Sequence, residues 1–462
     1  MFSPEVYINR RNSLKQKISN GLLFLPGNLE ASFNYPANTY HFRQDSTFLY
    51  FFGLNQPDLA AVIDVDSGKD YLFGNDVDMD DIIWMGPQPS MKDRGAKVGL
   101  ENTAPLAKLS EILLGAINKG QKIHILPTYR GDTVIQIANL LNINHNKVAD
   151  LVSDELIKAV VLLREIKDEY EIAEIEKAVG VAYEMHTTAM KMAMPGTIEQ
   201  EIAGKIEGIS MSGGGPVSFP IILSVHGETL HNHHHNNVLE IGQMMVTDSG
   251  SETLMGYASD ITRTVPVGGK FNKRQKEIYE IVLKANTEVI ENCKPGVLYR
   301  DMHFLAAKTI VAGLKKLGLM KGNIDDAVAQ GAHALFMPHG LGHQMGLDVH
   351  DMEGLGEDNV GYDDEIKRSN QFGLAFLRLG KKLKKGFVIT DEPGIYFIPA
   401  LIDLWKSENK FTEFINYDKL ESYKDFGGIR IEDDLLITDT GCRVLGKPIP
   451  KTIAEIENTM GQ

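Results

Sequence analysis

Short apolar runs alternate with amphipathic stretches along the first third of the chain. Such runs, rich in Leu, Ile, Val and Phe, predict buried strands, and they fall at residues 21–27, 46–54, 59–65, 69–74 and 122–127. Residues 105–120 and 133–143 carry apolar positions at helical spacing instead. The alternation predicts a mixed α/β domain that holds no concentrated catalytic constellation of its own.

From about residue 164 the pattern changes to long amphipathic helices that would cover a sheet. Apolar positions at roughly helical spacing follow Asp168, and the same spacing returns in residues 271–296 and 299–320. The chain has 462 residues, which exceeds what one hydrophobic core usually holds. We therefore expect two domains, residues 1–163 and residues 164–462.

Residues 244–264, MMVTDSGSETLMGYASDITRT, predict a hairpin with an acidic residue on each arm. The apolar run 244–246 leads to Asp248, a Gly/Ser turn follows, and a second extended segment brings Asp260 back. If the arms pair, the two carboxylates face each other across neighbouring strands. Two close anions repel unless a cation lies between them, so the pair predicts a bound metal ion.

Three later segments can supply further ligands, namely histidines and glutamates. These are His339, His343 and His350 in MPHGLGHQMGLDVHD, Glu392 in ITDEPGIYF, and Glu432 in GIRIEDDLLIT. The last segment alternates like one strand, so Arg430 is expected on the same face as Glu432. Gly340 and Gly342 disfavour a regular helix and indicate a bend with close backbone approach.

The expected metal ligands are four carboxylates and one imidazole, namely Asp248, Asp260, His343, Glu392 and Glu432. Carboxylates can bridge two cations, so the set suits a dinuclear site about 3.5 to 4 Å across that activates a water molecule. Oxygen-rich coordination with a single imidazole and no thiolate suits Mn²⁺, with Co²⁺, Fe²⁺ and Zn²⁺ as competitors. The ligands indicate the class of metal rather than the metal itself.

These residues and their surroundings resemble the proline-specific metallopeptidases of the pita-bread fold, aminopeptidase P and prolidase. The resemblance rests on the order Asp, Asp, His, Glu, Glu and on the motifs ASDITRT, HGLGH, DEPG and GIRIED. It extends from about Phe42, because FRQDSTFLYFFGL is similar to the N-terminal domain of that family. It implies an α/β (α+β) fold, in which an N-terminal aminopeptidase P-like domain precedes a pita-bread (creatinase/aminopeptidase-like) catalytic domain.

The resemblance also implies a catalytic set around the metal ligands, made up of Glu392, His231, His339 and His350. Glu392 would be both a ligand and a proton shuttle. His231 matches a histidine beside the substrate carbonyl, and His231 or His350 would stabilise the oxyanion. His339 would lie next to the ligands, whereas His233, His234 and His235 are expected on the surface.

Three residues are implied in substrate binding, namely Arg430, Arg378 and Trp84. Arg378 matches an arginine that holds the C-terminal carboxylate of a dipeptide in prolidases, although an exposed basic loop would also carry Arg for solubility. Trp84, in DDIIWMG, resembles a tryptophan that reaches the active site of a neighbouring subunit. That role requires a homo-oligomer, a dimer or a tetramer; the alternative is an aromatic packed within its own domain.

The implied function is a dinuclear-metal exopeptidase that hydrolyses the bond between an N-terminal residue and a following proline in small peptides. The alternative is an Xaa-Pro dipeptidase (prolidase) restricted to dipeptides, which Arg378 and the long segment after Tyr396 favour. A non-catalytic pita-bread binding module is disfavoured because all five candidate ligands are present. Methionine aminopeptidase is a weaker alternative, because it ordinarily lacks so large an N-terminal domain.

Composition narrows the expected partners and location. A net charge of -15 argues against nucleic acid and against an anionic membrane surface. No uncharged apolar run is long enough to span a membrane, and residues 1–17 lack the apolar core of a signal peptide. Cys293 and Cys442 make no disulfide framework and are expected as unpaired thiols in a reducing cytoplasm. We therefore expect a cytoplasmic protein.

Overall fold

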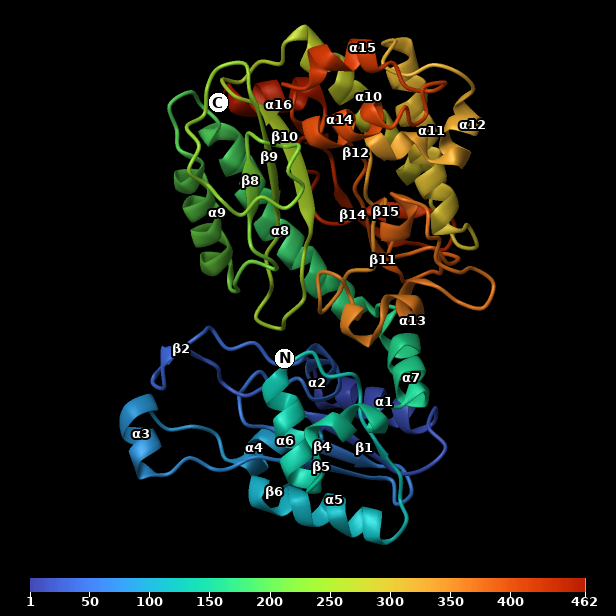
Figure 1. The fold of residues 1–462 in the computed structure, drawn as a ribbon. Coiled ribbons are helices and arrows are strands. Elements are labelled where there is room, and N and C mark those ends of the chain that lie inside the picture. Colours follow the sequence, from blue (N-terminus) through green and yellow to red (C-terminus); the bar gives the residue numbers. More distant parts are fainter. Residues whose placement is uncertain (462) are drawn as a thin grey trace. The chain divides into compact units, whose positions relative to one another are not determined.

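The computed structural model describes residues 1–461, and they form two compact units (Figure 1). Unit 1 comprises Met1–Glu165 and Met352–Asn359, and unit 2 comprises Ile166–Asp351 and the chain from Val360 onwards. The domain limits expected from the sequence, 1–163 and 164–462, stay a prediction, and their last residue, Gln462, lies outside the described residues.

Unit 1 is built around a mixed sheet with the strand order β6-β5-β4-β1-β7. Its central pairs β1–β4 and β4–β5 are antiparallel. The edge strands are parallel to their neighbours, β6 to β5 and β7 to β1. The strands are β1 (Leu22–Pro26), β4 (Ala60–Asp64), β5 (Lys69–Phe73), β6 (Asn102–Ala104) and β7 (Ile123–His124), with a separate hairpin of β2 (Ser32–Tyr35) and β3 (Asn38–Thr39). The helices are α1 (Pro4–Lys15), α2 (Ser46–Phe52), α3 (Met79–Met85), α4 (Met91–Lys97), α5 (Leu109–Asn118), α6 (Gly131–Leu141) and α7 (Asp154–Arg164), with short 3₁₀ turns η1 (Leu106–Lys108), η2 (His145–Leu151) and η4 (Glu353–Leu355).

The prediction of a strand over residues 46–54 is wrong, because this segment contains helix α2. The Asp45 side chain accepts a hydrogen bond from the Phe48 N–H and caps the start of the helix, and Gly53 ends it in the left-handed conformation at φ 61°. All residues of α2 are buried, so the helix has no polar face that would distinguish it from a buried strand. The available sequence signals were the flanking Asp and Gly.

Unit 2 contains three small sheets, with orders β10-β9-β8, β11-β14-β15 and β12-β13, among the described residues. The strands are β8 (Ile222–Ser224), β9 (Met244–Ser249), β10 (Ile261–Pro266), β11 (Val388–Asp391), β12 (Gly394–Tyr396), β13 (Gly428–Arg430), β14 (Asp433–Ile437) and β15 (Cys442–Val444). The helices are α8 (Glu169–Met192), α9 (Glu199–Gly213), α10 (Lys273–Asn292), α11 (Tyr299–Lys316), α12 (Ile324–Gln330), α13 (Glu357–Gly361), which spans the unit boundary, α14 (Pro399–Ser407), α15 (Tyr417–Leu420) and α16 (Ile453–Met460), with 3₁₀ turns η3 (Ala332–Leu335), η5 (Leu374–Phe376) and η6 (Glu421–Tyr423).

Amphipathic helices cover these sheets, as their sequence pattern predicts. Helix α8 begins with a capping box of Asp168 and Glu171. It packs against α9 and β9, and α9 packs against β8. Helix α10 packs against α11 and against β11, β12, β13 and β15. One continuous hydrophobic core joins the helices to the strands and fixes the strand ends that present the polar residues described next. No helix within residues 1–461 has both the length and the apolar character that crossing a membrane requires.

Candidate metal centre and active site

One cavity of about 530 Å³ in unit 2 collects the polar residues that the sequence singled out. All five expected metal ligands line it, together with His231, His339, His350, Arg378 and Arg430. Trp84 is not among the lining residues; it lies on α3 of unit 1 and its side chain is 86% exposed. Residues from segments far apart in the chain therefore meet in one cavity of unit 2.

The two aspartates lie on the predicted hairpin, but they are not direct cross-strand partners. Strands β9 and β10 pair antiparallel with Asp248 opposite Thr262, so Asp260 lies just before β10 and diagonal to Asp248. The backbone N–H of Asp260 is fixed by the carboxylate of Asp434, at 3.1 Å. The two carboxylates are still close enough for a proton to bridge them, and Asp248 raises the pKa of Asp260 after the larger effect of burial.

Arg430 and Glu432 do not share one strand as predicted. Strand β13 ends at Arg430, β14 begins at Asp433 in a different sheet, and Glu432 occupies the break between them. Both side chains still face the cavity, because both contact Thr262: Arg430 Nε donates to Thr262 Oγ1 (2.9 Å), which donates to Glu432 Oε2 (2.6 Å). The guanidinium of Arg430 also donates to Asp248 Oδ2.

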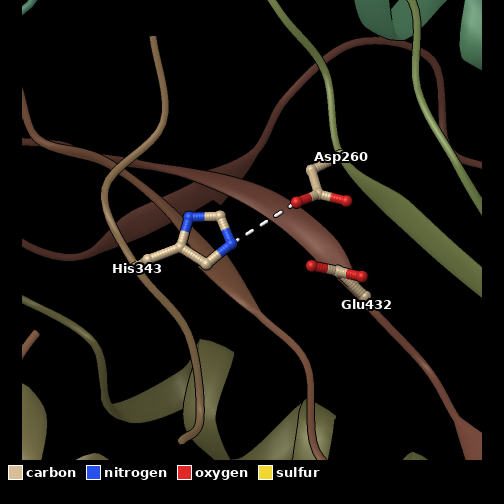
Figure 2. A group of neighbouring side chains, drawn as sticks. All are labelled: Asp260, His343 and Glu432. Carbon is tan, nitrogen blue, oxygen red and sulfur yellow. Dashed lines mark ion pairs between the residues drawn. The ribbon is translucent and has the colours of Figure 1, made fainter. Parts of the chain in front are cut away.

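His343 is presented by the glycine-rich bend that the sequence predicts. A Cβ on Gly340 would lie 2.6 Å from the Leu377 backbone, and one on Gly342 would lie 2.3 Å from the Thr390 carbonyl, so both positions need glycine. His343 Nδ1 donates to the Gln344 carbonyl (3.0 Å), so Nε2 is the nitrogen that presents its lone pair toward the carboxylates. Nε2 lies 3.4 Å from Asp260 Oδ2, and Figure 2 shows the imidazole facing the carboxylates of Asp260 and Glu432.

Glu392 follows strand β11 directly and lies against the histidine bend. Its backbone N–H donates to the Leu341 carbonyl (2.9 Å), and its carboxylate lies 3.8 Å from His343 Nε2 and 3.8 Å from His339 Nδ1. Burial raises the pKa of Glu392 to about 7, helped by repulsion from Asp260 and Asp248 and opposed by His343 and Arg430. Glu392 can therefore exchange a proton near neutral pH.

The chemistry of this donor set fits divalent metal ions. Potential ligand atoms of Asp260, His343 and Glu432 lie within 4.8 Å of one another. Burial, followed by repulsion among the carboxylates, raises the pKa of Asp260 and of Glu432 well above the ordinary values. Within residues 1–461 the buried Oδ1 of Asp248 has no hydrogen-bond donor. A cation would satisfy these oxygens, and a site of carboxylates with one imidazole suits such an ion.

His339 belongs to a hydrogen-bonded chain that supports Arg430. Its Nδ1 donates to the Gly340 carbonyl (2.7 Å), and its Nε2 accepts from the Tyr396 hydroxyl (3.0 Å), which in turn accepts from Arg430 Nη1 (2.9 Å). Burial first, and then the charge of Arg430, lowers the pKa of His339 to about 3. His339 is therefore a neutral imidazole with both nitrogens engaged.

His231, His350 and Arg378 also line this cavity. The His350 ring packs edge-on against His343, with the centroids 4.3 Å apart. Burial is the largest cause that lowers the pKa of His231, and the positive charges of Arg430 and Arg378 lower it further. Arg378 is therefore close enough to His231 to influence its charge. His233, which the sequence analysis expects on the surface, also lines the cavity.

Sequence reasoning missed the residues that hold the site in shape. Thr262 and Tyr396 lie inside quoted motifs, but no sequence signal placed Thr262 between Arg430 and Glu432 or Tyr396 between Arg430 and His339. Lys167 and Asp351 form an ion pair of 2.7 Å in which both side chains are almost fully buried. Because Asp351 directly follows His350, this ion pair anchors the loop that carries His350. The only sequence signal for the ion pair was the position of Asp351 next to a predicted histidine.

Comparison with known proteins identifies relatives along nearly the whole chain. The profile of metallopeptidase family M24 matches residues 173–439, and that of the aminopeptidase P N-terminal domain matches residues 7–126. A probable Xaa-Pro aminopeptidase of Fusarium vanettenii is 34% identical over 451 residues, covering 96% of this chain and 93% of the relative. The Xaa-Pro dipeptidase of Homo sapiens is 33% identical over 432 residues, covering 91% of this chain and 84% of the relative.

A solved structure supports the same relationship at the level of the fold. Aminopeptidase P from E. coli, in its low-pH form, matches with a TM-score of 0.82 at 28% identity and covers 100% of this chain and 99% of its own. The mixed α/β architecture, with an N-terminal domain and a C-terminal pita-bread domain, is therefore confirmed.

Gly342→Ala tests the close approach that positions His343. We expect the free energy of unfolding of unit 2 to fall by roughly 1 to 3 kcal/mol, the usual cost of overpacking, because the new methyl would lie 2.6 Å from the Tyr299 hydroxyl as well as against Thr390. Urea titration followed by circular dichroism measures it. Gly180→Ala is the control, since Gly180 is exposed on α8 with no neighbour within 4 Å. Equal effects of the two substitutions would contradict the interpretation.

Proposed function

The chain belongs to metallopeptidase family M24, and we propose how its residues carry out its activity as an Xaa-Pro exopeptidase. Such a metallo-exopeptidase cleaves small peptides between the first residue and a following proline. The observation that carries the residue assignment is the meeting of the five expected ligands at one cavity. We propose that they hold two divalent cations, with Mn²⁺ the preferred ion and Co²⁺, Fe²⁺ or Zn²⁺ as alternatives.

Glu392 is proposed to move the proton in the reaction. When bound, the cations would lower the pKa of a water molecule, so that hydroxide is available at neutral pH to attack a peptide carbonyl. Glu392 would accept a proton of that water and return it to the leaving nitrogen, since its carboxylate lies among the expected ligands, 3.8 Å from His343 Nε2. The leaving nitrogen of an Xaa-Pro bond is the imino nitrogen of proline, whose departure requires this proton.

The histidines and Arg430 are proposed to orient the substrate and the ligands. His231 or His350 would donate to the oxyanion that forms on the substrate carbonyl, a contribution of roughly 3 to 4 kcal/mol in comparable sites. The neutral His339 accepts from Tyr396 and so holds the hydroxyl that accepts from Arg430. Arg430 in turn orients Asp248 through a hydrogen bond from its guanidinium. The free amine of the peptide would approach the acidic ligands.

The finer choice lies between an Xaa-Pro aminopeptidase and an Xaa-Pro dipeptidase. The aminopeptidase remains our first proposal, and Arg378 is the observation that favours the dipeptidase. It lines the cavity that holds the candidate ligands, and a guanidinium there can pair with the free carboxylate of a dipeptide. A longer peptide has an amide at that position and gains nothing from the charge.

We also propose a homo-oligomer, a dimer or tetramer, in which Trp84 reaches the cavity of a neighbouring subunit. The support is the exposed apolar surface of α3, where Met79, Ile83, Trp84 and Met85 are each at least two-thirds exposed. A cytoplasmic location is proposed from the two free thiols.

Metal binding tests the ligand set. Asp260→Asn and Glu432→Gln should each weaken Mn²⁺ binding by more than about 100-fold, since even the loss of an outer partner costs 10- to 100-fold. Metal analysis after equilibrium dialysis measures it, and Glu408→Gln, an exposed acid on unit 2, is the control. Two tightly bound ions in Glu432→Gln would refute the assignment.

The affinity for Mn²⁺ should also depend on pH, and the same equilibrium dialysis measures it. Glu392 has a raised pKa of about 7, so below pH 7 it carries a proton that a cation must displace. Affinity should therefore fall as pH falls from 7 to 6, by about tenfold per unit for each proton displaced. The Glu392→Gln variant should bind Mn²⁺ more weakly, and its affinity should depend less steeply on pH. An unchanged pH dependence would remove Glu392 from the ligand set.

Peptide length tests Arg378. Arg378→Gln should raise KM for Xaa-Pro dipeptides by about 10- to 100-fold, the value of a charge-assisted hydrogen bond, and should change KM for Xaa-Pro-Yaa tripeptides much less. Lys367→Gln, an exposed cation of the same segment, is the control. Parent enzyme that cleaves dipeptides alone would select the dipeptidase, and equal losses on both substrates would exclude a carboxylate clamp.

Subunit complementation tests Trp84. Trp84→Ala should lower kcat/KM by roughly tenfold or more, the cost of losing an interface aromatic. Co-expression of Trp84→Ala chains with Glu392→Gln chains should restore activity, because each mixed pair has one site with intact Glu392 beside an intact Trp84. Activity no greater than the sum of the two variants, or a monomer in sedimentation, would show that Trp84 acts within its own chain.

A further inference from the structure

Cys293 and Cys442 meet in unit 2 although they lie far apart in the chain. Cys293 follows the last turn of α10 and is 1% exposed, whereas Cys442 begins strand β15 and is partly exposed. Cys442 Sγ donates to the carbonyl of Ile290 at 3.1 Å, one helical turn before Cys293. A Cβ added to the neighbouring Gly441 would lie 3.9 Å from the Cys293 carbonyl oxygen, so the two segments are adjacent. The two side chains therefore face each other across the contact of α10 with β15.

The two thiols differ in reactivity. The Cys293 thiol is hydrogen-bonded to the Cys442 sulfur, which lowers the pKa of Cys442; the same bond, followed by burial, raises the pKa of Cys293. A thiolate is the nucleophilic form of cysteine, and Cys442 is the one that solvent reaches. An oxidant would therefore react first at Cys442, with Cys293 already next to it.

We propose that Cys442 and Cys293 form a redox-active dithiol that closes to an intramolecular disulfide when the protein meets a peroxide. The Cys442 thiolate attacks one peroxide oxygen, the O–O bond breaks, and a sulfenic acid and hydroxide form. The Cys293 sulfur then attacks the sulfenic sulfur, the S–S bond forms, and the S–O bond breaks as its oxygen leaves as water. Overall, two thiols and one hydrogen peroxide give one disulfide and two waters.

The disulfide would join two elements that support the cavity. Strand β15 pairs with β14, and β14 pairs with β11. Glu432 directly precedes β14 and Glu392 directly follows β11. Asn286 of α10 already donates to the carboxylate of Asp391 at 3.0 Å. Because the side chains are in contact in the reduced fold, closing the bond requires little rearrangement, and it constrains the unfolded chain over a long loop.

The test compares reduced and peroxide-treated full-length protein and does not depend on peptidase activity. Treatment with hydrogen peroxide should remove both reactive thiols, lower the intact mass by two hydrogens and yield a peptide pair that joins Cys293 to Cys442. The midpoint of thermal unfolding should rise by several degrees, and dithiothreitol should reverse every change.

Two variants keep the test falsifiable. Cys442→Ser should leave Cys293 unreactive and the midpoint unchanged, whereas Cys293→Ala should leave Cys442 as a sulfenic acid or its further oxidation products without a cross-link. A disulfide between two chains, sulfenic acid persisting on Cys442 in the parent, two thiols that survive treatment, or a cross-linked protein that melts lower than the reduced one would each overturn the proposal.

Discussion

The burial of four carboxylates around one cavity is the constraint on which unit 2 depends. Ionised carboxylates this close repel one another, and burial removes the water that would screen them, which is why the pKa values of Asp260, Glu392 and Glu432 all rise. The protein offsets part of this cost with Arg430, whose guanidinium contacts Asp248. Bound cations would offset the rest of this cost. The surrounding hydrophobic core holds the strands in place, so the carboxylates cannot move apart to reduce their repulsion.

Rigid elements hold this arrangement from several directions. Strand β9 carries Asp248, and Asp260 directly precedes β10. Glu392 directly follows β11, Glu432 lies in the break between β13 and β14, and the glycine-rich bend at Gly342 positions His343. Beneath them, the buried Arg263 donates to the Glu432 carbonyl at 2.6 Å and to the Asp433 carboxylate at 2.6 Å. Ligands fixed in this way need little reorganisation when charge develops during the reaction.

The charges along the cavity also suggest how a short peptide is oriented. Four of the five candidate ligands are carboxylates, and Arg378 lines the same cavity. A free amine is attracted to the carboxylates and a free carboxylate to the guanidinium, so a dipeptide with both ends ionised would have one preferred direction. Aromatic and aliphatic lining residues such as Phe219, Phe372 and Phe376 suit the ring of proline.

The sequence by itself determined the local patterns of this protein and predicted its chemistry. Its ordered acids and histidine, the glycines of the histidine bend and the amphipathic helices were all local patterns, and the structure bears out the bend and the helices. Tertiary structure alone decided that Asp260 lies diagonal to Asp248, that Arg430 and Glu432 belong to no common strand, and that residues 46–52 are a helix. It alone brought Cys293 to Cys442, and it alone placed Thr262 between Arg430 and Glu432 and Tyr396 between Arg430 and His339. The reason is physical: residue types and their spacing act along the chain, whereas strand register, the burial of whole helices and contacts between distant segments are decided by packing across it.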